Sequence, residues 1–134
     1  MLESTAGNGA AEVPSPETGA AGFDVAVTWH ESIIVLGVAG TLDMVTAPQL
    51  TESILTSLTD EPAAVVVDLT DVEFLASAGM TVLIAANEQL SQKARFAVVA
   101  DGPATGRPMR LVGVDKMLTL YPTLDAAIED LTVA

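Results

Sequence analysis

The sequence predicts a single α/β domain, built on a central mixed sheet of about five strands with about four helices. Three observations predict this class. Apolar residues alternate with polar or small ones from Phe23 to about Trp29, which is typical of a strand with one covered face. A nearly continuous apolar run from Ala63 to Leu69 is typical of a central strand covered on both faces. Segments with helical spacing of their apolar residues separate these strands, so we expect helices to pack on the sheet.

The chain of 134 residues has room for one such domain, which we expect to span residues 23–134. Residues 1–22 consist mostly of Ala, Gly, Pro, Ser, Thr and Glu, so they are predicted to form a disordered tail. This tail lacks the features of a secretory signal, and no apolar run is long enough to span a membrane. There is no Cys, which excludes disulfides and thiol chemistry. We therefore expect a cytoplasmic protein.

The first two strands are predicted to form an antiparallel hairpin. The second strand is expected from Ile33 to Ala39, and His30, Glu31 and Ser32 offer a turn before it. Because this connection is so short, the two strands should lie side by side and run in opposite directions.

A helix is predicted to begin at Thr46. Thr46 and Gln49 have the Ser/Thr-x-x-Glu/Gln spacing of a capping box, and Pro48 is tolerated because the first turn does not use its missing N–H. The apolar stripe of this helix comprises Leu50, Ile54, Leu55 and Leu58. Asp60-Glu61-Pro62 is expected to end the helix before the central strand.

The rest of the chain repeats this alternation. A helix is predicted from Ser77 to about Gln92, with Met80, Leu83, Ile84 and Leu90 near one face. The later elements are predicted to be a strand from Ala94 to Ala100, a short helix from Ala104 to Val112 ended by Gly113, and a strand from Lys116 to Leu120. A final helix, capped by Thr123, should face inward with Leu124, Ala127, Ile128 and Leu131.

Charge is distributed unevenly along the chain. The sequence has 5 basic and 18 acidic residues, for a net charge of −13. All of the basic residues lie after position 92, so the entire acidic excess belongs to residues 1–92. Such a chain repels phosphate backbones, which argues against nucleic-acid binding. It favours a partner with a basic surface, although acidity that only maintains solubility is an open alternative.

The candidates for catalysis are weak. The one histidine, His30, lies in a predicted turn, so a Ser-His-Asp arrangement is not expected. The segment 102–106 contains glycines but lacks the Gly-Lys-Ser/Thr ending of a phosphate-binding loop, and it is predicted to be a turn. Asp68, Asp71 and Glu73 lie between a predicted strand and helix, where carboxylates could hold Mg²⁺. Acids in such places more often stabilise a turn or face solvent, so we expect no enzyme, no metal and no cofactor.

A serine at a predicted helix start is the strongest functional candidate. Ser77 is flanked by Ala76 and Ala78 and is followed by Gly79, so nothing bulky beside it in the sequence shields its hydroxyl from another protein. The free N–H groups of a helix start would also accept a phosphate on this side chain. The local sequence leaves open the alternative that Ser77 is an ordinary N-cap.

Three motifs occur in order along the chain: Gly40-Thr41-Leu42-Asp43, Val65-Val66-Val67-Asp68-Leu69, and Phe74-Leu75-Ala76-Ser77-Ala78-Gly79-Met80. Together with the order of elements from about Phe23 to Leu131, they resemble the STAS family, in particular its bacterial anti-sigma factor antagonists. The resemblance implies a protein that binds an anti-sigma factor of the serine kinase type and thereby releases the sigma factor. It also implies that this kinase phosphorylates Ser77, which weakens the complex, and that a serine phosphatase restores it.

The resemblance further implies a switch region, formed by Asp43, Ala76, Ser77, Ala78, Gly79 and Met80. Family members commonly carry Asp before the phosphorylated Ser, where this chain has Ala76. That departure removes like-charge repulsion toward an incoming phosphate, but it also removes a group that could orient the kinase. Two alternatives stay open: a STAS-like scaffold or small-ligand-binding module without phosphorylation, and a hydrolase that uses the acidic cluster. Neither nucleic acid nor a membrane is an expected partner.

Overall fold

The computed structural model describes residues 22–90 and 92–132, so the predicted tail falls almost entirely outside the described residues. Its strands are β1 (Asp24–His30), β2 (Ile33–Leu42), β3 (Ala64–Leu75), β4 (Arg95–Val99) and β5 (Leu120–Tyr121). Its helices are α1 (Ala47–Ser57), α2 (Ser77–Leu90), α3 (Gly106–Leu111) and α4 (Leu124–Thr132), with 3-10 turns η1 (Leu58–Asp60) and η2 (Val114–Lys116).

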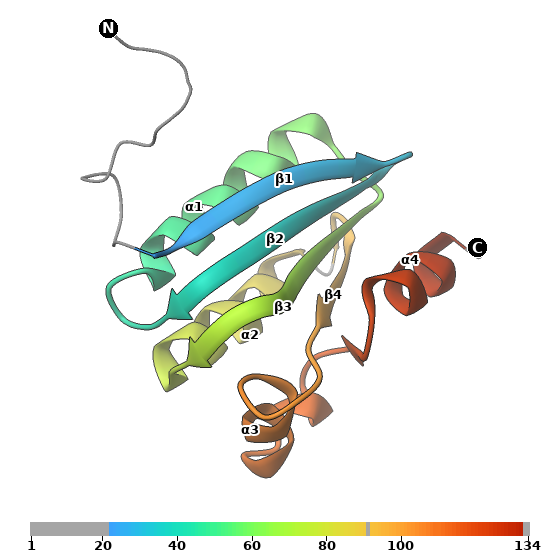
Figure 1. Cartoon of the computed structure of the whole chain (residues 1–134). Coiled ribbons are helices and arrows are strands. Elements are labelled where there is room, and N and C mark those ends of the chain that lie inside the picture. The colour runs from blue at the N-terminus through green and yellow to red at the C-terminus, as the bar shows by residue number, and fades with distance from the viewer. Residues whose placement is uncertain (1–21, 91, 133–134) are drawn as a thin grey trace, which may run out of the picture.

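The strands form one mixed sheet in the order β1-β2-β3-β4-β5 (Figure 1). β1 and β2 form an antiparallel hairpin, and every other neighbouring pair of strands is parallel. The predicted α/β class, the hairpin and the mixed sheet are therefore confirmed. None of the helices in the described part of the chain is long and apolar enough to cross a membrane.

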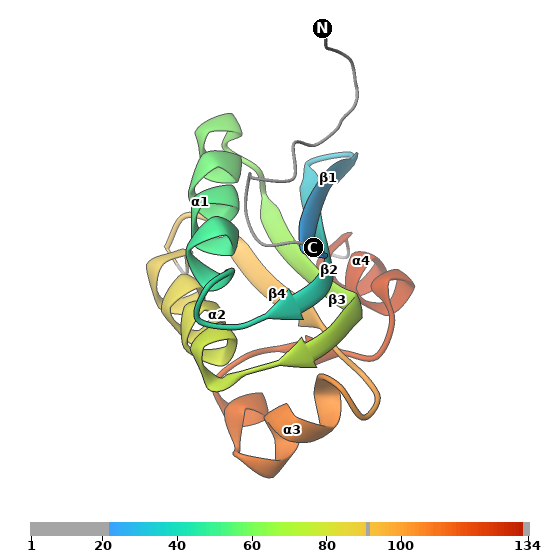
Figure 2. The same cartoon turned by 60° about the vertical axis from the view of Figure 1, so that its left-hand side comes forward.

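Helices cover both faces of this sheet. Figure 2 shows α1 and α2 on one face and α4 on the other. Leu36 of β2 and Val67 of β3 belong to the core beneath α1 and α2, whereas Val35 and Val66 belong to the core beneath α4. Neighbouring residues of a strand point to opposite faces, so the part of a strand that lies between two helical layers is apolar at nearly every position. The interpretation of the long apolar run as a central strand is confirmed.

β3 is longer than the sequence predicted, because it continues past Leu69 to Leu75. Two register shifts against β2 interrupt the ladder in this second half. Each shift inserts one extra residue, which reverses the alternation of the side chains. Leu69, Val72 and Leu75 consequently all point into the core at a spacing that a regular strand does not allow.

The three acids expected in a loop after this strand lie within β3 instead. The Asp68 carboxylate accepts hydrogen bonds from the N–H and the hydroxyl of Thr70, at 3.0 and 2.5 Å, so it stabilises the irregular part of the strand. Asp71 and Glu73 are exposed. Over residues 22–90 and 92–132, no group of three or more His, Cys, Asp or Glu side chains could hold a metal ion. The arrangement of these acids thus gives the hydrolase alternative no support.

The C-terminal third differs from prediction in one strand. The segment Lys116–Leu120 was expected to be a strand, but η2 ends at Lys116 and β5 comprises Leu120–Tyr121 alone. Gly113 ends the α3 region with a φ of 83°, as predicted, since the left-handed region favours glycine. The predicted cap of α4 is also confirmed, because the Ala126 N–H donates to the Thr123 hydroxyl at 3.1 Å.

α4 is fixed to the sheet by side-chain hydrogen bonds as well as by packing. The Tyr121 hydroxyl donates to the Asp130 carboxylate, and Arg95 donates to the Leu131 carbonyl at 3.4 Å. Burial, followed by the hydrogen bond and the charge of Asp130, raises the pKa of Tyr121. The hydroxyl therefore stays protonated and can donate this hydrogen bond. The two hydrogen bonds hold α4 against β4 and β5.

Candidate partner-binding site

Two loops lie side by side at the carboxyl ends of β2 and β3 (Figure 2). The last residues of these strands, Leu42 and Leu75, are partners in the parallel ladder. The Ala76 N–H then donates to the Leu42 carbonyl at 2.9 Å. Asp43 begins the loop after β2, and Ser77 begins α2 directly after Ala76, so the structure brings the two parts of the predicted switch region together.

The loop after β2 is held by its own side chains. The Asp43 carboxylate accepts hydrogen bonds from the N–H groups of Val45 and Thr46, at 2.9 and 3.1 Å. The Thr46 hydroxyl donates to the Thr41 carbonyl at 2.8 Å and accepts from the Asp43 N–H at 2.9 Å. Since this hydroxyl turns back toward β2, it does not cap α1, and the predicted capping box with Gln49 is wrong. Asp43 therefore has a structural role, which is to fix the loop.

α2 begins at Ser77, and Ala76 is its N-cap residue. The Ala76 carbonyl accepts hydrogen bonds from the N–H groups of Gly79 and Met80, at 2.9 and 3.3 Å. Ser77 is exposed, and its carbonyl accepts a hydrogen bond from the Thr81 hydroxyl at 3.0 Å. The Ser77 hydroxyl itself makes no hydrogen bond to any residue that the structure describes. The structure therefore does not support the alternative that Ser77 is an N-cap.

The first turn of α2 can accept negative charge. The N–H groups of Ser77 and Ala78 stand where a helix has no internal acceptor for them. The methyl side chain of Ala76 cannot accept a hydrogen bond from them either. Because a helix N-terminus also has positive dipole potential, a phosphate on Ser77 would be compatible with this fold.

Gly79 allows α2 to lie close to the ends of the two strands. A Cβ atom at this position would lie 2.7 Å from Leu42 Cγ and 2.8 Å from Leu75 Cδ1. Both leucines are buried in the core, so they have little room to move away. The glycine thus sets the position of the helix start that presents Ser77.

Gly79→Ala is expected to lower the free energy of unfolding by about 1–3 kcal/mol, because the added methyl overpacks this contact. Denaturant unfolding followed by circular dichroism measures the change. The sign of the change in the free energy of unfolding is informative, because Gly→Ala in an unhindered helix interior raises stability by about 1 kcal/mol. A more stable variant would show that α2 does not need this close approach.

Three large apolar side chains are exposed on the elements that bear this site, and we call them the apolar rim: Met44, Val45 and Phe74. Met44 and Val45 form the tip of the loop after β2, and Phe74 lies near the end of β3. Their exposed fractions are 77%, 71% and 58%. Grouped apolar side chains at the surface are typical of protein-binding sites. Sequence reasoning missed the rim, although an apolar pair in a short loop has no obvious place in a core.

Not every residue of the predicted switch region is available to a partner. Met80 is only 9% exposed and packs in the main core, so it supports α2 and cannot contribute a contact surface. Ala76 and Ala78 are half-buried, whereas Ser77 is exposed. The exposed groups of this region are therefore the Ser77 hydroxyl, the apolar rim and the acids Asp71 and Glu73 of β3.

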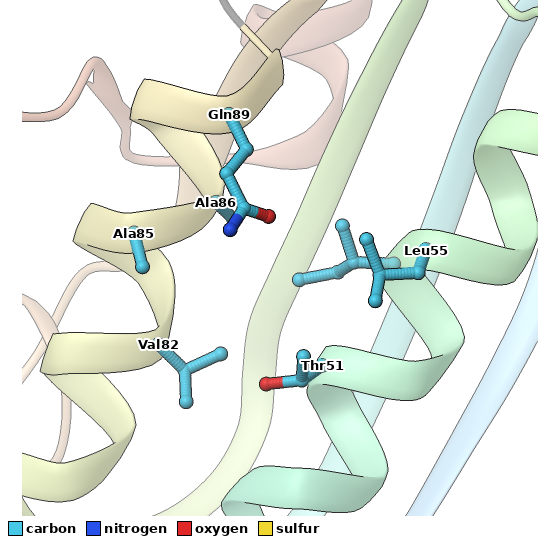
Figure 3. A pocket seen from close by; sticks show the side chains of 7 residues that line it. Thr51, Leu55, Val82, Ala85, Ala86 and Gln89 are labelled. Carbon is cyan, nitrogen blue, oxygen red and sulfur yellow. The ribbon is translucent and has the colours of Figure 1, made fainter.

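A hollow between α1 and α2 bears on the small-ligand alternative (Figure 3). It is lined by Thr51, Ile54, Leu55, Val82, Ala85, Ala86 and Gln89. Leu55, predicted to belong to the apolar stripe of α1, is 49% exposed and forms part of its wall. The hollow has a volume of about 50 Å³, far below the roughly 300–1,000 Å³ of typical ligand pockets. It has no room for a nucleotide.

Similarity to known proteins agrees with this architecture. The model of the STAS domain matches residues 24–127. This chain belongs to the STAS family. The match spans the whole described sheet and the start of α4, so the family resemblance suggested by the three sequence motifs is confirmed.

Two mycobacterial proteins are similar to this chain in sequence. The anti-sigma-F factor antagonist RsfB of Mycobacterium tuberculosis is 42% identical over 104 residues, which cover 78% of this chain and 85% of RsfB. The crystal structure of an anti-sigma factor antagonist from Mycobacterium paratuberculosis superposes with a TM-score of 0.77 at 45% identity, covering 82% of this chain and 94% of that one.

The fold extends to proteins of much lower sequence identity. The phosphorylated form of the Bacillus cell fate determinant SpoIIAA superposes with a TM-score of 0.59 at 16% identity, over 81% of this chain and 98% of that one. At this level of identity the comparison concerns the fold alone.

Proposed function

We propose that this STAS protein is an anti-sigma factor antagonist, which binds a kinase-type anti-sigma factor through Ser77 and the apolar rim and so frees the sigma factor. Phosphorylation of Ser77 by that kinase weakens the complex, and a serine phosphatase restores it. The names of its two mycobacterial relatives, both anti-sigma factor antagonists, support the first statement. The observation that supports the second is the free hydroxyl of Ser77, exposed at the first position of α2.

A phosphate on Ser77 would act on the interface rather than on the fold. It adds about −1.5 to −2 charge at neutral pH. In the complex, the side chains of the apolar rim would exclude water around Ser77, and burying an uncompensated charge there is costly. In the free protein the same group stays in water, next to the unused N–H groups of α2. The modification therefore lowers the stability of the complex more than that of the protein.

Phosphorylation can be tested directly with the anti-sigma factor kinase and ATP. We expect intact-mass spectrometry to find one added phosphate on the wild-type protein and none on Ser77→Ala. Thr81→Ala is the matched control, because Thr81 is an exposed hydroxyl residue one turn further along α2 and should leave phosphate incorporation unchanged. Phosphate on Ser77→Ala, or none on the wild type, would refute the switch while leaving the binding proposal open.

Binding to the anti-sigma factor is expected to weaken as salt is added. Asp71 and Glu73 are exposed beside Phe74, and the described chain has no basic residue before Lys93. Such a surface should attract a basic partner, and salt screens exposed charges over roughly 8 Å at physiological ionic strength. Stopped-flow measurements should show that the association rate falls most. A rate that is constant from low to high salt would leave solubility as the role of the acidic excess.

A further inference from the structure

β1 is an open edge of the sheet. Figure 1 shows it as the outermost strand, and within the described residues its one neighbour is β2. Backbone groups of successive strand residues point alternately to either side, so about half of those in this strand have no strand to bond to. Natural edge strands usually carry Lys, Pro or a bulge that prevents further pairing. β1, with the sequence Asp-Val-Ala-Val-Thr-Trp-His and an unbroken register against β2, has none of these.

The side chains of this edge are apolar on one face. Val27 and Trp29 are 56% and 46% exposed. Their partners on β2, Leu36 and Ile34, belong to the main core, so both side chains lie on the face that α1 covers incompletely. A groove of about 320 Å³ beside α1 is lined in part by Val27 and Ile34. The apolar core therefore continues to the edge of the sheet, where no other element of the described structure covers it fully.

The sequence of β1 is complementary to itself when it is reversed. In an antiparallel pair of two β1 strands centred on Val27, each Val25 would lie opposite Trp29 of the other copy. A β-branched side chain opposite an aromatic one is a favourable cross-strand pair. Asp24 would lie opposite His30, which can donate a hydrogen bond to a carboxylate in either protonation state. The register that pairs the apolar residues of β1 therefore also pairs its two ionisable residues, Asp24 and His30.

We propose that β1 is a dimerisation edge, on which the β1 strand of a second copy pairs antiparallel about a two-fold axis through Val27. The two sheets then form one continuous sheet of ten strands, given the five in each copy. The edge is separate from the start of α2, which bears Ser77, so the inference does not depend on the proposed switch. Because each copy has a net charge of −13, added salt strengthens the dimer, which is the opposite of its effect on the anti-sigma factor complex.

Sedimentation equilibrium and fluorescence of the full chain test this dimer. Trp29 is the sole tryptophan, so its emission should shift to shorter wavelength as rising concentration converts monomer to dimer. Val27→Lys places two ammonium groups opposite each other at the axis, and we expect it to raise the dimer dissociation constant at least about tenfold. Val112→Lys is the matched control, since Val112 is 65% exposed on a different element, and it should leave the constant unchanged.

A charge exchange tests the register. His30→Asp alone places two carboxylates opposite each other and should weaken the dimer. Asp24→His combined with His30→Asp restores the complementary pairs and should recover it. Within the chain, Asp24 and His30 pair with Ala39 and Ile33 of β2, which are uncharged. The exchange therefore creates no charge repulsion between β1 and β2.

Several results would contradict the proposed dimerisation edge. A protein that stays monomeric with constant Trp29 emission, or a dimer that survives Val27→Lys, would overturn the proposal. So would a dimer that appears only after residues 1–21 are deleted, because the edge would then belong to that segment. Ser77→Glu should dimerise like the wild type, which keeps this test independent of the proposed function.

Discussion

Replacing Ser77 with Glu is expected to weaken binding of the anti-sigma factor about 100-fold, or about 2.7 kcal/mol, without unfolding the protein. The carboxylate would lie in an interface formed by the apolar rim, where an unpaired charge is costly to bury. In the free protein the same carboxylate lies at a helix N-terminus, where it is neutral or slightly stabilising. Isothermal titration calorimetry gives the affinity, and thermal unfolding shows that the fold is retained.

Ser77→Ala is the matched control for this experiment. The hydroxyl of Ser77 caps nothing in the described structure, so its loss should cost only a few tenths of a kcal/mol of stability. The variant should bind like unmodified wild type and stay bound when ATP is supplied. If Ser77→Glu binds as tightly as Ser77→Ala, the partner does not cover this position, and the proposed switch fails.

The second large effect is expected at the apolar rim. Phe74→Ala should weaken binding by about 2 kcal/mol or more, roughly thirtyfold, because a large aromatic side chain that becomes buried in an interface is a typical hot spot. Stability should change little, since this side chain is 58% exposed in the free protein. Surface plasmon resonance with the unmodified protein measures the loss, which should be mainly in the dissociation rate.

Leu55→Ala provides the comparison for Phe74→Ala. Leu55 is 49% exposed, but it lies in the hollow between α1 and α2 and not beside Ser77. Its truncation should leave the affinity unchanged. Equal losses for the two variants would indicate a general effect of surface apolarity, whereas no loss for Phe74→Ala would place the partner elsewhere.

The order of the elements could be predicted from local patterns because each pattern has one structural cause. The run from Ala63 to Leu69 is apolar at every position but Asp68, which is typical of a strand with helices on both faces, and the structure has them. The continuation of β3 could not be predicted in this way. Its inward residues Leu69, Val72 and Leu75 repeat every third position, a spacing that arises from bulges against β2 and matches neither a strand nor a helix.

The candidate site could also be predicted only in part. Ser77 could be found because small neighbours and a helix start are local features of the sequence. The roles of Thr46 and Asp43 could not, because their hydrogen bonds depend on how the loop folds back on the end of β2. Exposure of Phe74 depends on the bulges, which decide the face to which each residue of β3 points. Long-range pairing therefore sets the details on which partner binding depends.

One glycine allows the segment directly ahead of β1 to lie against the end of β2. Gly40, near the end of β2, has a φ of 100°, and a Cβ atom there would lie 1.6 Å from the Gly22 carbonyl oxygen. The chain therefore enters the domain against the same end of the sheet that bears Ser77. α4, the last element, lies on the face away from α1 and α2 (Figure 2). A purification tag or fluorescent reporter fused directly to Gly22 would start beside the proposed partner-binding surface. A C-terminal fusion would leave that surface accessible.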